Sequence, residues 1–273
     1  MQIKIHRGIN QIGGCVTEIR SKKARILIDV GTNLPNCDNK VKVNVAKVSK
    51  KCDAVFISHY HLDHIGEYMK VKKEVPIYIG EQAKEIFMIY QKRMKEPSIA
   101  EVTQEHIDRI KTFKTFRPNE TIEIGDIRLT PIRIDHSAFD SYMFLIEADD
   151  KRVLHTGDFR MHGPLGRLIP KILEDVGNVD ILICEHTTLS RVDEILMSEF
   201  ELQKDAIDLI KNNKYVFIMC ASTNIDRIAS FYHANRKAGT KLFICDDYQK
   251  EILDYVTKTT LKHTDYYNFS DVK

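Results

Sequence analysis

Short apolar runs alternate with polar segments through the first half of the chain. Six of these runs have the length and the polar or glycine boundaries that are typical of buried strands, namely residues 25–30, 54–58, 121–124, 127–134, 142–147 and 152–155. The Gly125-Asp126 pair between two of them suits a tight hairpin turn. Apolar residues recur at helical spacing in residues 81–95, and a second helix is predicted over 103–113.

The hydrophobic period changes near residue 190. The pattern there predicts helices over residues 192–211, 224–237 and 248–258, which alternate with strands over 215–220 and 241–245. Strands that alternate with amphipathic helices indicate a parallel, three-layer α/β arrangement. We therefore predict two domains, residues 1–189 and residues 190–273.

Composition narrows the class of protein. The 273 residues are enough for about two domains of roughly 150 residues. The 41 basic and 39 acidic residues leave a net charge of +2, which excludes a polybasic coat for nucleic acid but not a local basic groove. No apolar run approaches the ~20 residues of a membrane helix, and no signal peptide precedes the first strand. The six cysteines are scattered, with no CxxC pair, so we expect a cytoplasmic protein without a disulfide framework or a thiolate zinc site.

Three of the 11 histidines lie within six residues, in the segment His59-Tyr60-His61-Leu62-Asp63-His64. The predicted strand before them would carry this segment to its C-terminal end, where loops build sites. His59 and His61 are two residues apart in an extended loop, so they can point the same way and converge on one metal ion. Asp63 and His64 then turn into the next helix and face a neighbouring ion. Imidazole and carboxylate ligands suit zinc, with manganese or iron as alternatives.

Four more candidate residues lie at predicted strand ends: Asp29, His136, Asp158 and Glu185. Taken singly, a strand-end aspartate more often caps a turn, and a lone histidine is more often a satisfied core or surface group. Their order along the chain after the histidine-rich segment favours a common site instead.

This order of residues resembles the metallo-β-lactamase fold and, within it, the β-CASP nucleases, the group of RNase J and the cleavage-and-polyadenylation endonucleases. The stretches that carry the resemblance are LIDVG, ISHYHLDHIG, DHSAFDS, HTGDFRMHG and ICEHT, followed by the α/β segment. The resemblance implies an αββα sandwich with metal ions at one edge of its two sheets. A partial three-layer, β-CASP-like segment would follow it.

The resemblance also implies two zinc ions, with Mn²⁺ as an alternative metal. The ligands of the first ion would be His59, His61 and His136. The ligands of the second would be Asp63, His64 and Asp158, with Asp158 bridging both ions. Asp29 would orient a ligand histidine through a hydrogen bond. Glu185 matches the acidic residue at the head of the β-CASP insertion and is expected to orient a ligand in the same way.

The sequence departs from the family at its C-terminal end. Full-length members return from the insertion with a His-x-Ser-Gly-His-like stretch and a seventh ligand, a further histidine, and no such stretch occurs here. His233 and His263 lack a strand-end context, which leaves His186 as the one substitute within the chain. We expect the chain to end inside the insertion, with an incomplete second metal site and with exposed apolar surface that favours a homo-oligomer.

The first functional hypothesis is a zinc-dependent phosphodiesterase that cleaves RNA through a metal-activated water. Asp158 would supply the bridging carboxylate, and Asp63 would act as a base on the attacking water. Two alternatives remain, because the fold hosts many reactions. One is a hydrolase of a small ester, thioester or lactone, and the other is a metal-binding relative without turnover.

Three other segments have both a functional and a structural interpretation. Ser222 and Thr223 precede a predicted helix, where they would form either a phosphate cradle or an N-cap with a Thr223-x-x-Asp226 capping box. Arg160 follows Asp158 and would contact phosphates or lie in a solvated loop. Gly13-Gly14 would form a loop over the site or a hairpin turn.

Overall fold

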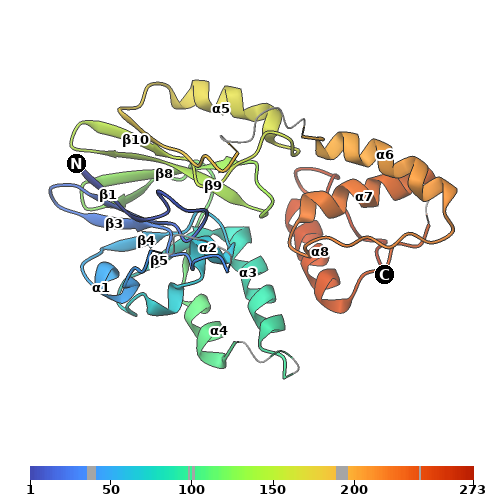
Figure 1. Ribbon diagram of the computed structural model, residues 1–273, viewed down its shortest axis with the longest axis horizontal. Helices are drawn as coiled ribbons and strands as arrows, with labels where there is room; N and C mark the ends of the chain where they lie inside the picture. Colours follow the sequence, from blue (N-terminus) through green and yellow to red (C-terminus); the bar gives the residue numbers. More distant parts are fainter. Residues whose placement is uncertain (36–40, 98, 100–101, 189–195, 240) are drawn as a thin grey trace.

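The computed structural model describes the whole chain except residues 36–40, 98, 100–101, 189–195 and 240. Its first sheet has six strands in the order β1-β2-β3-β4-β5-β6 (Figure 1). The first three strands are antiparallel, and the pairs from β3 to β6 are parallel. The strands are β1 (Gln2–Arg7), β2 (Val16–Arg20), β3 (Arg25–Ile28), β4 (Ala54–Phe56), β5 (Ile77–Gly80) and β6 (Lys114–Phe116).

The second sheet has five strands in the order β11-β10-β9-β8-β7. All its pairs are antiparallel except β10 with β11. The predicted hairpin between β7 and β8 is present, and its Gly125 has the positive φ of 61° that such a turn requires. The strands are β7 (Ile122–Ile124), β8 (Ile127–Ile134), β9 (Ser141–Ala148), β10 (Lys151–His155) and β11 (Ile181–Ile183).

Alternation along the strands decides how the two sheets pack, because successive side chains point to opposite faces. Phe56 and Phe144 face the layer between the sheets. Val55, beside Phe56, faces the helices on the outer side of the first sheet. Met143, beside Phe144, faces the outer side of the second sheet, where it packs with Ile169. The central strands of each sheet are therefore buried on both faces.

Helices cover the two outer faces (Figure 1). Those beside the first sheet are α1 (Val45–Ser49), α2 (Leu62–Ile65), α3 (Glu81–Met94) and α4 (Gln104–Lys111). The outer face of the second sheet is covered by α5 (Ile169–Val176), while two 3-10 turns occupy Tyr68–Lys70 and Gly166–Leu168. The αββα sandwich expected from the sequence is confirmed.

The last three helices form a separate group, which lies to the right in Figure 1. They are α6 (Glu199–Asn212), α7 (Ile225–Ala238) and α8 (Asp247–Thr260). Ile228 and Leu253 of this group belong to the same buried apolar cluster as Tyr60 and Phe139 of the sandwich, and α8 contacts α3. None of the described helices is long and apolar enough to cross a membrane.

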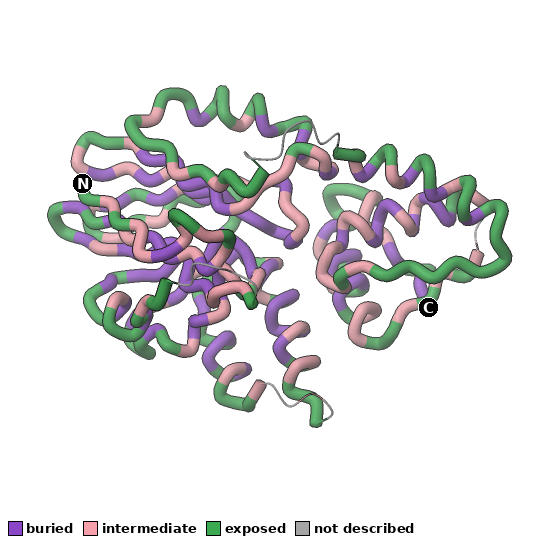
Figure 2. The backbone as a smooth tube through the Cα atoms, in the orientation of Figure 1, coloured by how far each residue is buried: buried purple, intermediate pink, exposed green. Residues whose placement is uncertain are grey.

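The second half of the chain differs from its predicted layout. Of the described residues after Ile183, none forms a strand, so the strands predicted over 215–220 and 241–245 are wrong, and so is the three-layer arrangement. An apolar run forms a strand only where another strand pairs with it, and here Phe217 and Met219 are 97% and 101% exposed. The stretch of chain between α6 and α7 is largely exposed (Figure 2). The segment around Phe243 instead bonds to the last residue of the chain. The carbonyl of Phe243 accepts from the N–H of Lys273, and the N–H of Cys245 donates to the carbonyl of Lys273.

The helix predicted over 192–211 begins later, at Glu199. The reason is a capping box, in which Ser198 accepts from the N–H of Glu201 and the Glu201 carboxylate accepts from the N–H of Ser198. Residues 192–195 of this prediction, and the domain boundary predicted between residues 189 and 190, lie outside the described residues.

Candidate metal centre

The histidine-rich segment begins shortly after the C-terminal end of β4, a central strand of the first sheet. His61 is the N-cap of the short helix α2, so the chain turns there and brings His64 back towards His59. The ring centroids of His59 and His64 are 4.1 Å apart. His59 and His64 are each 1% exposed, whereas His61 is only half-buried.

The structure brings His59, His61 and His136 together. One ring nitrogen from each lies within 4.8 Å of the other two. His136 arrives from the end of β8, and its Nε2 lies 3.2 Å from Nδ1 of His61. Three imidazoles arranged in this way match the ligand number of a metal ion that keeps an open position.

A second group contains His59, His64 and Asp158, again with ligand atoms within 4.8 Å of one another. Nε2 of His64 lies 3.3 Å from Oδ1 of Asp158, which follows β10, and 3.8 Å from Oδ2 of Asp63. Asp63 therefore lies beside His64 but outside both groups. His59 belongs to both.

Asp29 and Ser58 contact the Nδ1 atoms of two of the histidines. Asp29 follows β3, is fully buried, and has a φ of 61°. Its Oδ2 lies 2.7 Å from Nδ1 of His64 and accepts from the Ser58 hydroxyl at 2.8 Å, while Oδ1 accepts from the Ser58 N–H. The same hydroxyl oxygen lies 3.1 Å from Nδ1 of His59. The contact between Asp29 and a histidine is thus present, whereas the part played by Ser58 was not foreseen.

The Nε2 atoms of His59 and His64 test whether these residues fit a metal ion. Both atoms are buried, and neither makes a hydrogen bond to a described residue, although Nε2 of His64 lies 3.3 Å from the Asp158 carboxylate. A buried polar atom without a partner destabilises a fold by about 1–3 kcal/mol. A divalent ion bound by both Nε2 atoms would remove that penalty, so the arrangement fits a metal.

Electrostatics favour the metal-binding form of the first group. Burial, together with the neighbouring imidazoles, lowers the pKa of His59 well below its ordinary value. Burial and the nearby His61 lower the pKa of His136 to about 3. Burial also lowers the pKa of His61. All three rings are therefore neutral near pH 7, with lone pairs available for a ligand.

In the second group, by contrast, neighbouring groups favour the positively charged form of His64. Burial acts to lower the pKa of His64, but Cys15, Asp29 and Asp158 together raise it well above the ordinary value. Burial acts to raise the pKa of Asp158, but the His64 ring 3.3 Å away lowers it to about 2. A positive charge at this position is thus already favoured by two carboxylates, which is the environment that a cation requires.

A cavity of about 770 Å³ opens beside the second group. It lies between the loop that joins β1 to β2 and the ends of β10 and β11, and both His64 and Asp158 line it. Gly13 of that loop has a φ of 71°, and a Cβ atom there would lie 2.5 Å from Oδ2 of Asp63. Gly13-Gly14 thus lies in the connection of the antiparallel β1–β2 hairpin and, through Gly13, beside the site, so its two interpretations are not exclusive.

Glu185 and His186 also line this cavity, without joining either group. The Glu185 carboxylate accepts from the N–H of Thr187 at 2.9 Å, two residues further along the chain. No contact with a candidate ligand is seen for it among the described residues. His186 is exposed.

The turn before α7 differs from its predicted form. Asn224 is the N-cap, and its side chain accepts from the N–H of Arg227, so the capping box predicted between Thr223 and Asp226 is wrong. Ser222 and Thr223 are half-buried there. The Tyr60 hydroxyl donates to the carbonyl of Thr223 at 3.1 Å. The histidine-rich segment thus contacts this turn directly.

Arg160 was expected to contact phosphates or to lie in a solvated loop. Its side chain is 9% exposed and forms ion pairs with three carboxylates. Neither expectation describes it.

Comparison with known proteins adds to this geometry. A family model described as a beta-lactamase superfamily domain matches residues 24–218. The chain belongs to the metallo-β-lactamase superfamily. This superfamily member is 30% identical over 200 residues to an RNase J-like protein of Methanocaldococcus jannaschii, in an alignment that covers 70% of this chain and 44% of the relative. It is 24% identical over 277 aligned positions to ribonuclease J of Helicobacter pylori, with 96% of this chain and 39% of the relative covered.

Among solved structures, the metallo-β-lactamase chain is similar to a protein of unknown function from Enterococcus faecalis V583, with a TM-score of 0.74 and 20% identity. That match covers 92% of this chain and 66% of the other, and it supports the fold. The chain spans less than half the length of the two curated relatives named above.

Proposed function

We propose that this metallo-β-lactamase superfamily member is a metal-dependent phosphodiesterase that cleaves RNA, as a member of the β-CASP nuclease group. One observation carries the proposal. Two ligand groups share His59, the second of them lines a cavity through His64 and Asp158, and the buried Nε2 atoms of His59 and His64 make no hydrogen bond to a described residue. The similarity to proteins named ribonuclease J points to RNA as the substrate. The six scattered cysteines, without a CxxC pair, support a cytoplasmic location.

We propose zinc as the metal, because neutral imidazoles dominate the first group, with manganese as the alternative. The first site would use His59, His61 and His136, and the second would use Asp63, His64 and Asp158. A bound divalent ion polarises a phosphate and lowers the pKa of a coordinated water. The same residues would serve a metallohydrolase of any phosphodiester.

The remaining roles fall to side chains of the chain itself. Asp63 is only partly buried and lies beside the cavity loop, so it is placed to accept a proton from an attacking water. Asp158 belongs to the second group and lines the cavity, and its carboxylate would be the one that the two sites share. Asp29 would hold His64 in one tautomer.

Three further assignments are part of the same proposal. Glu185 lines the cavity, and its carboxylate accepts from the N–H of Thr187. It would orient groups in the cavity by holding this part of the chain in place. Ser222 and Thr223 would contact a substrate phosphate near the histidine-rich segment, to which Tyr60 joins them. The exposed apolar run that includes Phe217 and Met219 favours assembly into a homo-oligomer.

The test uses the purified protein with added Zn²⁺ or Mn²⁺ and a labelled single-stranded RNA. We expect cleavage that a chelator abolishes, and a loss of more than about a hundredfold in His61→Ala and Asp158→Asn. His263→Ala, which changes an exposed histidine remote from both groups, should cleave at the parent rate. Cleavage that persists in His61→Ala would contradict the proposal. Hydrolysis of small esters or lactones with no action on RNA would favour the alternative hydrolase.

A further inference from the structure

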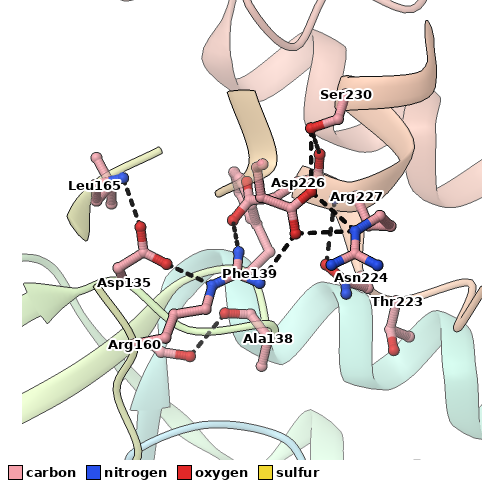
Figure 3. Close-up of polar contacts among 12 residues, drawn as sticks. Asp135, Ala138, Phe139, Arg160, Leu165, Thr223, Asn224, Asp226, Arg227 and Ser230 are labelled. Atoms are coloured by element: carbon pink, nitrogen blue, oxygen red, sulfur yellow. Dashed lines mark hydrogen bonds and ion pairs between the residues drawn. The ribbon is translucent and has the colours of Figure 1, made fainter. Parts of the chain in front are cut away.

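The side chain of Arg160 is 9% exposed and lies between Asp135 and Asp226 (Figure 3), and it contacts a third carboxylate, that of Glu199. Nε lies 2.6 Å from Oδ1 of Asp135, and Nη2 lies 2.7 Å from Oδ2 of Asp226. Nη1 lies 3.4 Å from Oε1 of Glu199. Each of the three guanidinium nitrogens therefore faces a carboxylate of this chain, and none is directed to a ligand.

These carboxylates come from distant parts of the chain. Asp135 directly precedes His136 at the end of β8, and its carbonyl also accepts from the N–H of Arg160 at 2.9 Å. Glu199 is the first residue of α6, and Asp226 lies in the first turn of α7. Arg160 itself is two residues after Asp158. One side chain thus joins the loops of two proposed metal ligands to two helices of the C-terminal group.

The carboxylates are held by further partners. Oδ2 of Asp135 accepts from the N–H of Leu165 at 2.6 Å. Glu199 is fully buried and accepts from Nε of Arg227 at 2.9 Å and from the Ser230 hydroxyl at 3.2 Å. Oδ1 of Asp226 accepts from the Tyr267 hydroxyl at 2.8 Å. Because its members are paired, the network holds one arrangement of the groups that it connects.

A buried ion network of this kind is a poor source of net stability, because removing the charges from water offsets their attraction. Its better attested role is to specify one geometry. The geometry specified here is the position of α6 and α7 relative to the two ligand loops.

We propose that Arg160 is a positioning residue that couples the placement of α6 and α7 to the separation of His136 and Asp158. The proposal rests on the proposed function where it treats these two residues as ligands. The coupling itself can be measured without metal or substrate.

The first experiment is amide hydrogen exchange of the metal-free protein near neutral pH. Burial raises the pKa of Asp226 to about 6, so its carboxylate is ionised under these conditions. Asp226→Asn removes the negative charge that α7 places beside Arg160. We expect the amides of Arg160 and Leu165, in the sandwich, to exchange about tenfold faster relative to the amides of β9.

The matched control is Asp208→Asn, which makes the same chemical change at an exposed position of α6. It should leave exchange at Arg160 and Leu165 unchanged. Faster exchange in Asp226→Asn that is confined to α7 would overturn the coupling. Taking rates relative to β9 separates this effect from a general loss of stability.

The second experiment compares Arg160→Lys with Arg160→Met. Lysine keeps the charge but offers no planar fork to three carboxylates. Competition against a chelator should show Zn²⁺ affinity lowered about tenfold in Asp226→Asn and Arg160→Lys, within the usual range of coupling between sites. On RNA, kcat should fall in these variants while KM changes little. Parent-like affinity and kcat in both variants would contradict the positioning role.

The two proposals fail in different ways. A parent protein that binds no Zn²⁺ and cleaves no RNA would refute the proposed function, while the exchange experiment would still decide the role of Arg160. Arg160→Met leaves three carboxylates without their partner, so it serves as a measure of folding. If Arg160→Met does not fold, the exchange experiment on Asp226→Asn decides the role of Arg160.

Discussion

Nδ1 of His64 lies 2.7 Å from Oδ2 of Asp29, although the two residues are 35 positions apart in the chain. Because Asp29 is fully buried and also accepts two bonds from Ser58, its carboxylate has one orientation. The contact keeps a proton on Nδ1, so that once Nε2 of His64 loses its own proton, its lone pair is directed at the candidate site.

This contact predicts the effect of Asp29→Asn. Asparagine tolerates the positive φ of 61° at this position, so the backbone should be retained. It carries no charge to hold Nδ1–H of His64, and we expect Zn²⁺ affinity to fall about 10–100-fold. Competition against a zinc chelator measures the change. Parent affinity in a folded Asp29→Asn protein would show that the contact does not orient the ring.

The metal-free protein should lose stability as the pH falls. Burial and the nearby His61 lower the pKa of His136 to about 3, from an ordinary value of 6.5. Between these values the unfolded chain binds a proton that the folded chain does not bind. The contribution of His136 to the free energy of unfolding is therefore complete above pH 6.5. It declines as the pH falls towards 3, by about 1.4 kcal/mol per pH unit.

Urea unfolding at several pH values measures this dependence. His136→Gln removes one titrating group and should give a shallower pH dependence than the parent. The exposed His263 provides the control, since His263→Gln should follow the parent curve. Equal slopes for His136→Gln and the parent would show that His136 is not held neutral by the fold.

Patterns in the sequence predicted the position of a candidate residue where that residue follows a buried strand. β8 has the predicted bounds, and β10 begins one residue earlier than predicted. The residues after them, His136 and Asp158, therefore reach the same edge as His59. The spacing of His59 and His61 predicted that these two residues converge, and the resemblance to the metallo-β-lactamase fold added His136 to them.

Contacts between distant residues were not accessible in the same way. Ser58 was missed because a hydroxyl adjacent to a histidine carries no pattern that names its partner. The partners of Arg160, Glu199 and Asp226, are 39 and 66 positions away. The apolar run that contains Phe217 predicted burial, yet a strand also requires a neighbouring strand, which hydrophobic periodicity does not report.

Metal should bind in two steps of unequal affinity. His59 belongs to both groups, and its Nδ1 faces the Ser58 hydroxyl, so its single free Nε2 can complete one group at a time. The first ion would take three imidazoles and leave Asp63, His64 and Asp158 for the second. Titration of metal-free protein with Zn²⁺ measures both steps.

Variants assign these steps to residues. His136→Ala should weaken the tighter step, and Asp158→Asn the weaker one, whereas His263→Ala should change neither. Two equally tight steps in the parent would mean that the second ion has ligands beyond these residues.

Gly13 offers a test of how close the cavity loop must lie to Asp63. Its φ of 71° disfavours any side chain, and a Cβ there would lie 2.5 Å from Oδ2 of Asp63. Gly239 has a φ of 113° but nothing within 4 Å of its Cβ position, so it has the same backbone requirement without the contact. Gly13→Ala and Gly239→Ala should each lower the free energy of unfolding by about 1 kcal/mol or more.

The two variants should differ in activity. In Gly13→Ala the loop or the Asp63 carboxylate must move, and a displacement of about 1 Å at a reacting group can lower a rate about a hundredfold. In Gly239→Ala the strain lies at the end of α7, and cleavage of RNA should continue at the parent rate. Rates and thermal unfolding measured on the same samples separate the two effects. Equal loss of activity in both variants would attribute the effect to stability and would leave the approach of Gly13 to Asp63 without a role in catalysis.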